Sequence, residues 1–267
     1  MEDHTPPRLG FMGRPQKPRP YGRTAMIDSG LPFGLFADVI GCHAPYVDAV
    51  KFGWTTALFT QTLPDKIALL RSMAIDCWFG GTFFEIAWAE GKLSQYTAWM
   101  RQLGITHVEV SDGTVAIDAT DRTRLIRALS AGFTVVSEVG KKADDAQPDP
   151  TEWVAAVQAD LAAGAAWVIL EGRESGTAGL YDGDGVLRHD LVGAILAAGI
   201  PLDRLIFEAP QKSQQVWLLR QLGPAINFGN IAWSDLISLE TLRRGLRSDT
   251  TGRMAEHDVF HPSRRAS

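Results

Sequence analysis

The segment Phe133-Thr-Val-Val-Ser-Glu138-Val-Gly-Lys141-Lys142 is a short apolar run that ends in a glutamate and is followed by two lysines. The same pattern recurs in Ala166-Trp-Val-Ile-Leu-Glu171-Gly-Arg173 and in Arg204-Leu-Ile-Phe-Glu208-Ala-Pro-Gln-Lys212. Each run follows a helix-like segment that stops at a glycine: Gly132, Gly164 and Gly199. The repeat predicts αβ units that carry ionisable groups where each strand ends.

Ionisable groups at strand ends have two interpretations. In parallel α/β folds, and above all in (β/α)8 barrels, the carboxyl ends of the strands form the active-site face. Carboxylates and cations gathered there indicate a metal and an anionic substrate. The structural alternative is that the acids cap helices and the cations are solvated in loops. Three such units in register favour a site.

Short, mostly apolar segments recur along the chain, and their composition is typical of strands that are covered on both faces. The predicted strands are about 24–28, 48–52, 76–79, 106–110, 134–138, 167–171, 204–208 and 225–228. Helical spacing lies between them, clearest in 121–132, 151–164 and 213–223. Strands that alternate with helices imply parallel pairing through crossovers. The pattern predicts a single-domain TIM-type (β/α)8 barrel, and a doubly wound open sheet is the alternative.

The two ends of the chain differ from its centre. Residues 1–23 combine prolines with arginines and lysine, so we expect a leader that is disordered or lies on the surface. Residues 24–247 are expected to form the catalytic barrel, and residues 248–267 a polar tail. The chain of 267 residues is close to the roughly 250 residues of one such barrel.

Composition excludes several classes of function. A formal charge of −5 argues against general nucleic-acid binding, which favours basic surfaces. Two cysteines, Cys42 and Cys77, provide no disulfide scaffold and fit a reducing compartment. No apolar stretch reaches the roughly 18 residues that a membrane span needs, and the N-terminus lacks the apolar segment of a signal peptide. The sequence therefore predicts a cytoplasmic protein without nucleic-acid or membrane partners.

The side chains at the predicted strand ends favour magnesium over zinc. Glu138, Glu171 and Glu208 offer the carboxylate oxygens that Mg²⁺ prefers, usually completed by substrate phosphate. Histidine and cysteine are nearly absent from these positions, which argues against a zinc site. His107 is expected near the start of its strand, at the opposite end of the barrel.

Several cations are expected around the same opening: Lys51, Lys141, Lys142, Arg173 and Lys212. They could form a structural ion-pair network, but so many cations suit a substrate with several negative charges. Gly229-Asn230 follows the eighth predicted strand and precedes a helix start, where barrels often bind phosphate. The alternative is that Asn230 caps a turn.

Longer motifs resemble those of a known family, in order over about residues 24–252. They are Lys51-Phe-Gly-Trp54, Gly80-Gly-Thr82, Glu109-Val-Ser-Asp-Gly113, Glu138-Val-Gly-Lys-Lys142, Glu171-Gly-Arg-Glu-Ser-Gly176, Phe207-Glu-Ala-Pro-Gln-Lys-Ser-Gln-Gln215 and Ile237-Ser-Leu-Glu-Thr-Leu-Arg-Arg-Gly-Leu-Arg247. The chain resembles the phosphosulfolactate synthase family, whose members add sulfite to phosphoenolpyruvate in coenzyme M biosynthesis. The resemblance implies an α/β barrel, Mg²⁺ as cofactor, and phosphoenolpyruvate and sulfite as substrates.

The implied reaction assigns roles to the candidate residues. Sulfite would attack C3 of phosphoenolpyruvate, negative charge would move onto the carboxylate, and a general acid would protonate C2, giving (2R)-phospho-3-sulfolactate. Lys141 is the expected acid, because a nearby cation or metal can bring a lysine pKa toward neutrality. Lys51 and Arg173 are the other expected catalytic residues, Lys51 as an anion clamp and Arg173 as the group that grips the phosphate or sulfonate. The expected substrate-binding residues are Lys212, Lys142, Ser111, Gly229 and Asn230, and the expected metal ligands are Glu138, Glu171, Glu208 and Asp112.

One departure keeps rival interpretations open. Where the family usually shows Gly-Thr-Ser after Lys51-Phe-Gly-Trp54, this chain has Thr55-Thr56-Ala57. A related barrel enzyme that adds another nucleophile to phosphoenolpyruvate is one alternative. A non-enzymatic relative of the heat-stress type is the other, because a family can contain members without the activity. A homo-oligomer is expected, with a trimer as one option.

Overall fold

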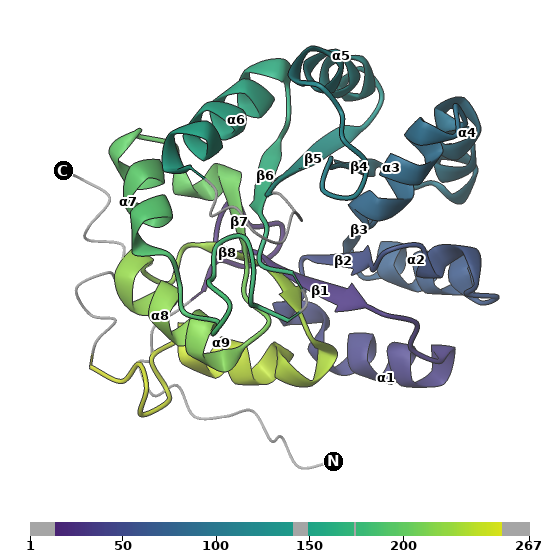
Figure 1. The fold of residues 1–267 in the computed structure, drawn as a ribbon. Helices are drawn as coiled ribbons and strands as arrows, with labels where there is room; N and C mark the ends of the chain where they lie inside the picture. The colour runs from purple at the N-terminus through teal and green to yellow at the C-terminus, as the bar shows by residue number, and fades with distance from the viewer. Residues whose placement is uncertain (1–13, 141–148, 174, 253–267) are drawn as a thin grey trace, which may run out of the picture.

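The computed structural model describes residues 14–140, 149–173 and 175–252, in which strands and helices alternate (Figure 1). The strands are β1 (Thr24–Asp28), β2 (Ala49–Phe52), β3 (Asp76–Phe79), β4 (His107–Val110), β5 (Thr134–Val139), β6 (Trp167–Leu170), β7 (Leu205–Glu208) and β8 (Asn227–Ile231). The α-helices are α1 (Phe33–His43), α2 (Leu63–Ser72), α3 (Gly81–Ala89), α4 (Leu93–Leu103), α5 (Ala119–Ser130), α6 (Pro150–Ala163), α7 (His189–Ala197), α8 (Lys212–Leu222) and α9 (Leu236–Arg243). None of these helices is long and apolar enough to cross a membrane.

The strands form one parallel sheet that curls into a barrel. Their order is β3-β2-β1-β8-β7-β6-β5-β4, so the first and last strands of the chain pair with each other. The helices surround the strands (Figure 1). The two edge strands, β3 and β4, lie against each other without a backbone ladder between them in the described residues. This arrangement confirms the predicted TIM-type barrel and rules out the open doubly wound sheet.

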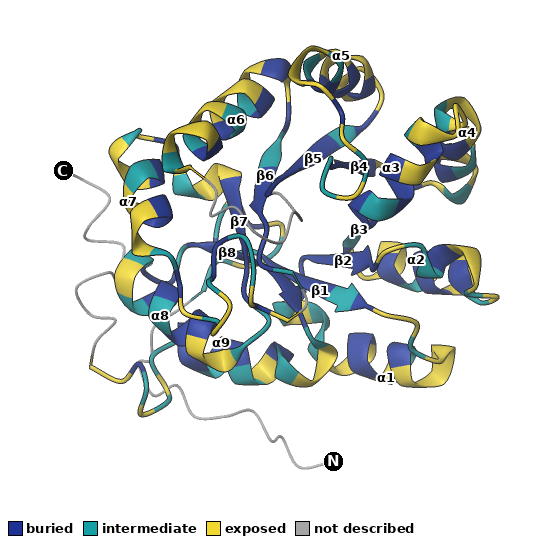
Figure 2. Ribbon diagram, in the orientation of Figure 1, coloured by how far each residue is buried: buried dark blue, intermediate teal, exposed yellow. Residues whose placement is uncertain are grey.

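Each strand is covered on one side by the barrel interior and on the other by the surrounding helices. Strands are buried on both faces, whereas each helix has a buried face toward the sheet and an exposed face toward solvent (Figure 2). Outward-facing strand residues join one large apolar core under the helices. Inward-facing residues form smaller clusters, of which Val136, Ile169 and Ile206 fill the centre of the barrel. These three side chains provide an apolar floor beneath the carboxyl ends of their strands.

The predicted strands and the three clearest predicted helices lie within about two residues of the observed ones, except that β8 ends at Ile231, three residues later than predicted. The start of α6 has Asp149 as its N-cap, whose carboxylate accepts a hydrogen bond from Thr151 N–H, followed by Pro150 in the first turn. Gly164 ends the helix in the left-handed conformation, at φ 116°. His107 begins β4 and stacks on Trp167, which places it at the amino end as expected.

The described part of the N-terminal leader lies against the barrel, the second of the two arrangements expected for it. Arg14 donates hydrogen bonds to the backbone of Gly22 and to the carboxylates of Asp48 and Glu240. Arg19 is buried and pairs with Asp48 at 3.0 Å. Residues 14–23 are therefore bound to the amino end of the barrel, because their arginines find buried acids there. Residues 1–13 of the leader and 253–267 of the tail lie outside the described residues.

Candidate active site

A cavity of about 320 Å³ opens at the carboxyl ends of the strands. Most of its walls come from strand ends and from the loops that follow them. The residues that line it are Ile27, Lys51, Trp54, Gly80, Gly81, Thr82, Glu109, Thr114, Glu138, Glu171, Arg173, Glu208 and Asn230. The three acid-bearing runs of the sequence thus meet at one opening, as their register predicted.

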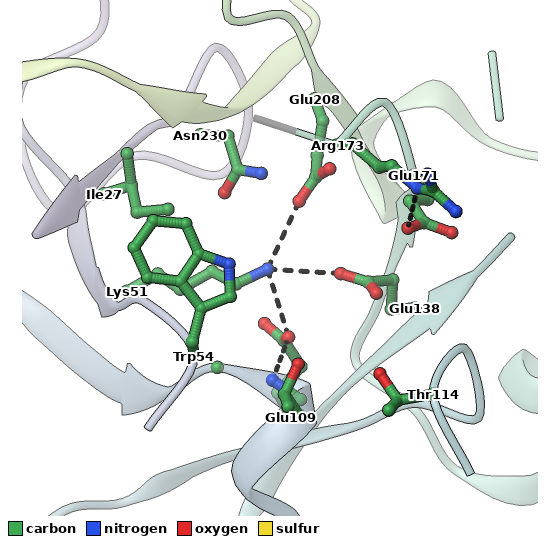
Figure 3. Close-up of a pocket in the computed structure, with 13 residues that line it drawn as sticks. Ile27, Lys51, Trp54, Glu109, Thr114, Glu138, Glu171, Arg173, Glu208 and Asn230 are labelled. Carbon is green, nitrogen blue, oxygen red and sulfur yellow. Dashed lines mark hydrogen bonds and ion pairs between the residues drawn. The ribbon is translucent and has the colours of Figure 1, made fainter. Parts of the chain in front are cut away.

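Lys51 lies at the centre of this cavity and is surrounded by carboxylates (Figure 3). Its Nζ atom lies 3.1 Å from an oxygen of each of two glutamates and 3.2 Å from a third: Glu109, Glu138 and Glu208. Three strands besides β2 thus contribute to one buried cluster. Each of the three N–H groups of the ammonium can donate to one of the three carboxyl groups. Because a single positive charge faces three acidic groups, Lys51 neutralises the charge of the cluster only in part.

Burial and mutual charge shift the pKa values of this cluster. Burial raises the pKa of Glu109 to about 7, and Glu138 and Glu208 add to the rise while Lys51 opposes it. Burial also raises the pKa of Glu208, against the attraction of Lys51. For Lys51 itself, burial acts to lower the pKa, but the three carboxylates outweigh it and hold the pKa well above its ordinary value. Lys51 therefore stays a cation.

Glu109 is the site residue that sequence reasoning left out of the candidate set. Its Oε2 accepts a hydrogen bond from Trp78 Nε1–H at 2.7 Å, and its Oε1 accepts one from Gly81 N–H at 2.5 Å. The sequence could have identified Glu109, because residues two apart in a strand point to the same face and Ser111 was already a candidate site residue. Asp112, which follows the end of β4 and was expected to bind metal, lies on the opposite face of the strand.

Backbone strain gathers at the cavity. Four described residues other than glycine have positive φ, and three of them line the cavity: Trp54 at 51°, Arg173 at 55° and Asn230 at 53°. A non-glycine residue in this region carries strain that usually marks a functional site. Gly80 is needed beside the Trp54 turn, because a Cβ atom there would lie 2.8 Å from Trp54 N.

The outer wall of the cavity holds the second cation. Arg173 follows β6, and its Nε lies 3.8 Å from Glu171 Oε1. Glu208 Oε2 accepts a hydrogen bond from Gly172 N–H at 3.0 Å, which ties the ends of β6 and β7 together. Asn230 lines the cavity from β8, whereas Gly229 lies within the strand and packs against Ile206.

The structure does not bring every predicted residue to the cavity. Asp112 pairs with Arg122 at 2.9 Å, and Ser111 donates its hydroxyl to Glu85. Lys212 is half exposed at the start of α8 and pairs with Asp249 at 2.7 Å. Lys141 and Lys142 lie outside the described residues. Lys51, Arg173, Asn230, Glu138, Glu171 and Glu208 are the predicted residues that line the cavity.

The donor set of the cavity fits a magnesium ion. The carboxylates of Glu138, Glu171 and Glu208 line it, and Asn230 Oδ1 is a buried oxygen that has no hydrogen-bond partner among the described residues. No group of three acidic, histidine or cysteine side chains in the described ranges is arranged to hold a metal by itself. A cavity with a few carboxylate oxygens and no complete protein cage suits Mg²⁺, which usually takes one or two carboxylates and completes its shell with water and substrate oxygens.

Comparison with known proteins relates this site to one family. The model of the family described as (2R)-phospho-3-sulfolactate synthase (ComA) matches residues 12–249. A phosphosulfolactate synthase of Methanothermobacter thermautotrophicus is 43% identical over 256 residues, which are 94% of this chain and 96% of that protein. A phosphosulfolactate synthase of Bacillus subtilis is 40% identical over 239 residues, 89% of this chain and 95% of that protein.

Solved structures of lower identity show the same fold. The YdjI aldolase from Escherichia coli K12 is 14% identical, covers 91% of this chain and 92% of its own, and gives a TM-score of 0.52. A 3-hexulose-6-phosphate synthase is 16% identical, covers 83% of this chain and 98% of its own, and gives a TM-score of 0.53. These likenesses concern the barrel alone. By its sequence matches over nearly the whole chain, this protein belongs to the (2R)-phospho-3-sulfolactate synthase family.

Proposed function

We propose that the cavity around Lys51 is where sulfite adds to phosphoenolpyruvate to give (2R)-phospho-3-sulfolactate, a step of coenzyme M biosynthesis. The observation that supports it most directly is the cluster of Lys51 with three glutamates at the carboxyl end of a barrel of this family. Membership in the family makes the chain a lyase of this type, and the buried cluster of charged groups supports this cavity as the place of its chemistry.

The charge of the cavity bears on how the substrates bind. Its described lining carries four carboxyl groups and two cations. Both substrates are multiply anionic, so this lining alone would repel them. Additional positive charge is required, and Mg²⁺ together with the lysines that follow β5 in the sequence would supply it. Bound Mg²⁺, with Glu138, Glu171 and Glu208 as candidate ligands, would lower the electrostatic cost of negative charge on the substrate carboxylate.

The chain's own groups are assigned to binding and proton transfer. In the addition, sulfur forms a bond to C3, the electron pair of the C2–C3 double bond moves toward C2 and the carboxylate, and one proton is added at C2. Arg173 is placed to grip a phosphate or sulfonate, since a guanidinium can donate two parallel hydrogen bonds to such a group. Lys51 would hold the surrounding carboxylates in place and contribute positive charge.

Lys141 is proposed as the acid that protonates C2, on sequence grounds. In the sequence it follows the end of β5 by two residues and Glu138 by three. Lys141→Ala should abolish turnover, by roughly a hundredfold or more, because general acids contribute about 10²–10⁴-fold. Lys92→Ala is the control and should keep full activity, because Lys92 is exposed, pairs with Glu90 and is not among the described residues that line the cavity. Steady-state turnover of both variants, together with their unfolding curves, checks the assignment, and normal turnover by Lys141→Ala would remove it.

The reaction is tested by phosphorus NMR of the purified protein with phosphoenolpyruvate, sulfite and Mg²⁺. The expected result is a new phosphate-ester signal with the mass of phosphosulfolactate, which appears only when both substrates are present and is lost in EDTA. Unchanged phosphoenolpyruvate with folded protein would contradict the proposal. If the product signal also appears in EDTA, the reaction is supported and only the proposed requirement for a metal is contradicted.

The sequence departure at Thr55-Thr56-Ala57 does not favour another nucleophile. Thr56 donates its hydroxyl to Gly53 O at 2.7 Å and so stabilises its own turn. None of the three residues is among the described residues that line the cavity. Thr55 and Thr56 are partly buried and Ala57 packs in the apolar core, so the departure lies outside the described lining of the site.

A further inference from the structure

Glu85 on α3 is a fully buried carboxylate that binds the loop after β4. It accepts hydrogen bonds from three successive backbone N–H groups: Gly113 at 3.2 Å, Thr114 at 2.5 Å and Val115 at 2.7 Å. It also accepts the hydroxyl of Ser111. Successive backbone N–H groups that converge in this way form an anion-binding nest. Here an internal carboxylate fills the nest, so the loop takes one shape.

This contact changes which hydroxyl of the loop can meet a substrate. Ser111, which the sequence predicted to bind substrate, is buried and directed at Glu85. Thr114 lies three residues further on, is exposed, and lines the cavity (Figure 3). Its backbone N–H is held by Glu85 Oε2, so the position of its side chain depends on Glu85.

We propose that Thr114 contacts the anionic substrate and that Glu85 is the residue that positions it. The inference rests on the proposed function, because it assigns a further substrate contact in the same cavity. A threonine hydroxyl can donate a hydrogen bond to a phosphate, carboxylate or sulfite oxygen without adding charge. On a wall otherwise lined by Glu109 and Glu138, such a neutral donor offsets part of the repulsion between the carboxylates and the incoming anion.

The chain offers matched variants for a test. Thr114→Val removes the hydroxyl and keeps the shape, and Thr114→Ser keeps the hydroxyl. Thr120→Val is the control, because Thr120 is an exposed threonine on α5 that is not among the residues lining the cavity. Glu85→Gln keeps the size of the side chain but replaces an acceptor oxygen with an NH₂ group that faces backbone donors.

Each variant is measured for KM toward phosphoenolpyruvate and sulfite, for kcat, for the Kd of phosphoenolpyruvate by calorimetry, and for Tm. Thr114→Val is expected to raise KM and Kd for its substrate about tenfold with little change in kcat, as loss of one hydrogen bond to a charged group does. Thr114→Ser and Thr120→Val should match the unmodified protein. Glu85→Gln should lower Tm and also raise KM, and Thr114→Val should add little when combined with it.

Several outcomes would overturn the inference. Unchanged KM and Kd in Thr114→Val would show that the hydroxyl does not contact substrate. A Glu85→Gln variant with lower Tm but normal KM, or an effect that multiplies with that of Thr114→Val, would leave Glu85 with a structural role only. If the unmodified protein binds phosphoenolpyruvate without turning it over, the proposed reaction fails and the Kd series still decides on Thr114. If it neither binds nor reacts, both proposals fail.

Discussion

At the scale of single residues, Lys51 determines the character of the site. Its ammonium faces Glu109, Glu138 and Glu208 within 3.2 Å, above an apolar floor. Each carboxylate is buried, and a buried charge is stable only when it is paired and hydrogen-bonded. The lysine therefore enables acidic groups to gather at a site that must also attract anions.

Replacing Lys51 should be costly for this reason. Lys51→Met leaves the carboxylates without their central cation and is expected to lower the free energy of unfolding by about 3–5 kcal/mol at neutral pH. Turnover should fall as well. Chemical denaturation at pH 8 and pH 5 checks the cause, because the loss should shrink at pH 5, where the carboxyl groups can take up protons. An equal loss at both pH values would argue against a charge effect.

Glu109 makes the stability of the fold depend on pH. The folded protein keeps the proton of this carboxyl up to about pH 7, while the unfolded chain releases it near the ordinary pKa of 4.5. The folded state therefore binds more protons between these values, and its free energy of unfolding falls as pH rises through this window. Glu109→Gln should flatten that slope. Unfolding curves from pH 4.5 to 8 for both proteins measure it, and parallel curves would contradict the assignment.

The residues of the site were predictable to different degrees. Glu138, Glu171 and Glu208 could be found because each ends an apolar run, and strand ends meet at one face of a barrel. Asp112 looked equivalent in sequence but turns toward Arg122, since side chains alternate between the faces of a strand. Asn230 Oδ1, which has no hydrogen-bond partner in the described part of the chain, is placed by a positive φ that no local pattern specifies.

At the scale of elements, Arg122 on α5 joins three parts of the fold beside the site. Its guanidinium binds Asp160 of α6 through two hydrogen bonds of 3.0 and 2.6 Å. It also donates to Asp112 after β4 and to the backbone oxygen of Glu138 on β5. The strand that carries a site carboxylate is thereby fixed to the helices outside it.

Breaking this junction should affect both stability and activity. Arg122→Met leaves Asp160 buried without its partner and is expected to lower the free energy of unfolding by about 3–5 kcal/mol. The remaining folded enzyme should show a lower kcat because Glu138 loses support. Asp112→Asn is the matched control and should cost about 1 kcal/mol or less, because Asp112 is partly exposed. Similar losses in both variants would contradict the central role of Asp160.

The elements themselves were largely predictable. Glycine after a helix and a short apolar run before an acid specify helix ends and strands locally, as at Gly164 and Trp167–Leu170. The ends of β8 were harder, because its residues Asn227 to Asn230 include polar side chains and a glycine. Their place in the sheet depends on pairing with β1 and β7, which the local sequence does not encode.

At the scale of the whole molecule, the two faces of the barrel have separate tasks. The carboxyl ends carry the cavity, and the amino ends are bound by residues 14–23. Arg14 connects Asp48, which precedes β2, with Glu240 of α9, so it joins the beginning and the end of the barrel. A composition rich in proline and arginine predicted no such role, because the acids that bind these arginines are distant in sequence.

Removing this connection should destabilise the fold without altering the site. Arg14→Ala removes the ion pairs of Arg14 with Asp48 and Glu240, but Asp48 keeps Arg19 and Glu240 keeps Arg244 as partners. The variant is expected to lower the free energy of unfolding by about 1.5–3 kcal/mol, as loss of hydrogen bonds to charged groups does, with unchanged KM values. Arg124→Ala is the control, because Arg124 forms an exposed pair with Asp121, and it should cost about 1 kcal/mol or less. Denaturation and steady-state kinetics test both variants, and a shifted KM in Arg14→Ala would refute the separation. The expected homo-oligomer and the cytoplasmic location stay predictions.

The seam between β3 and β4 gives the barrel one further property. No backbone ladder joins these strands in the described residues, and Glu109 on β4 links them by accepting from Trp78 on β3 and from Gly81 just after it. The same carboxylate holds Lys51. Glu109 thus bridges the open seam of the barrel, so we expect a separation of β3 and β4 to weaken its contact with Lys51 in the proposed site. A ligand that tightens the cluster would in turn close the seam.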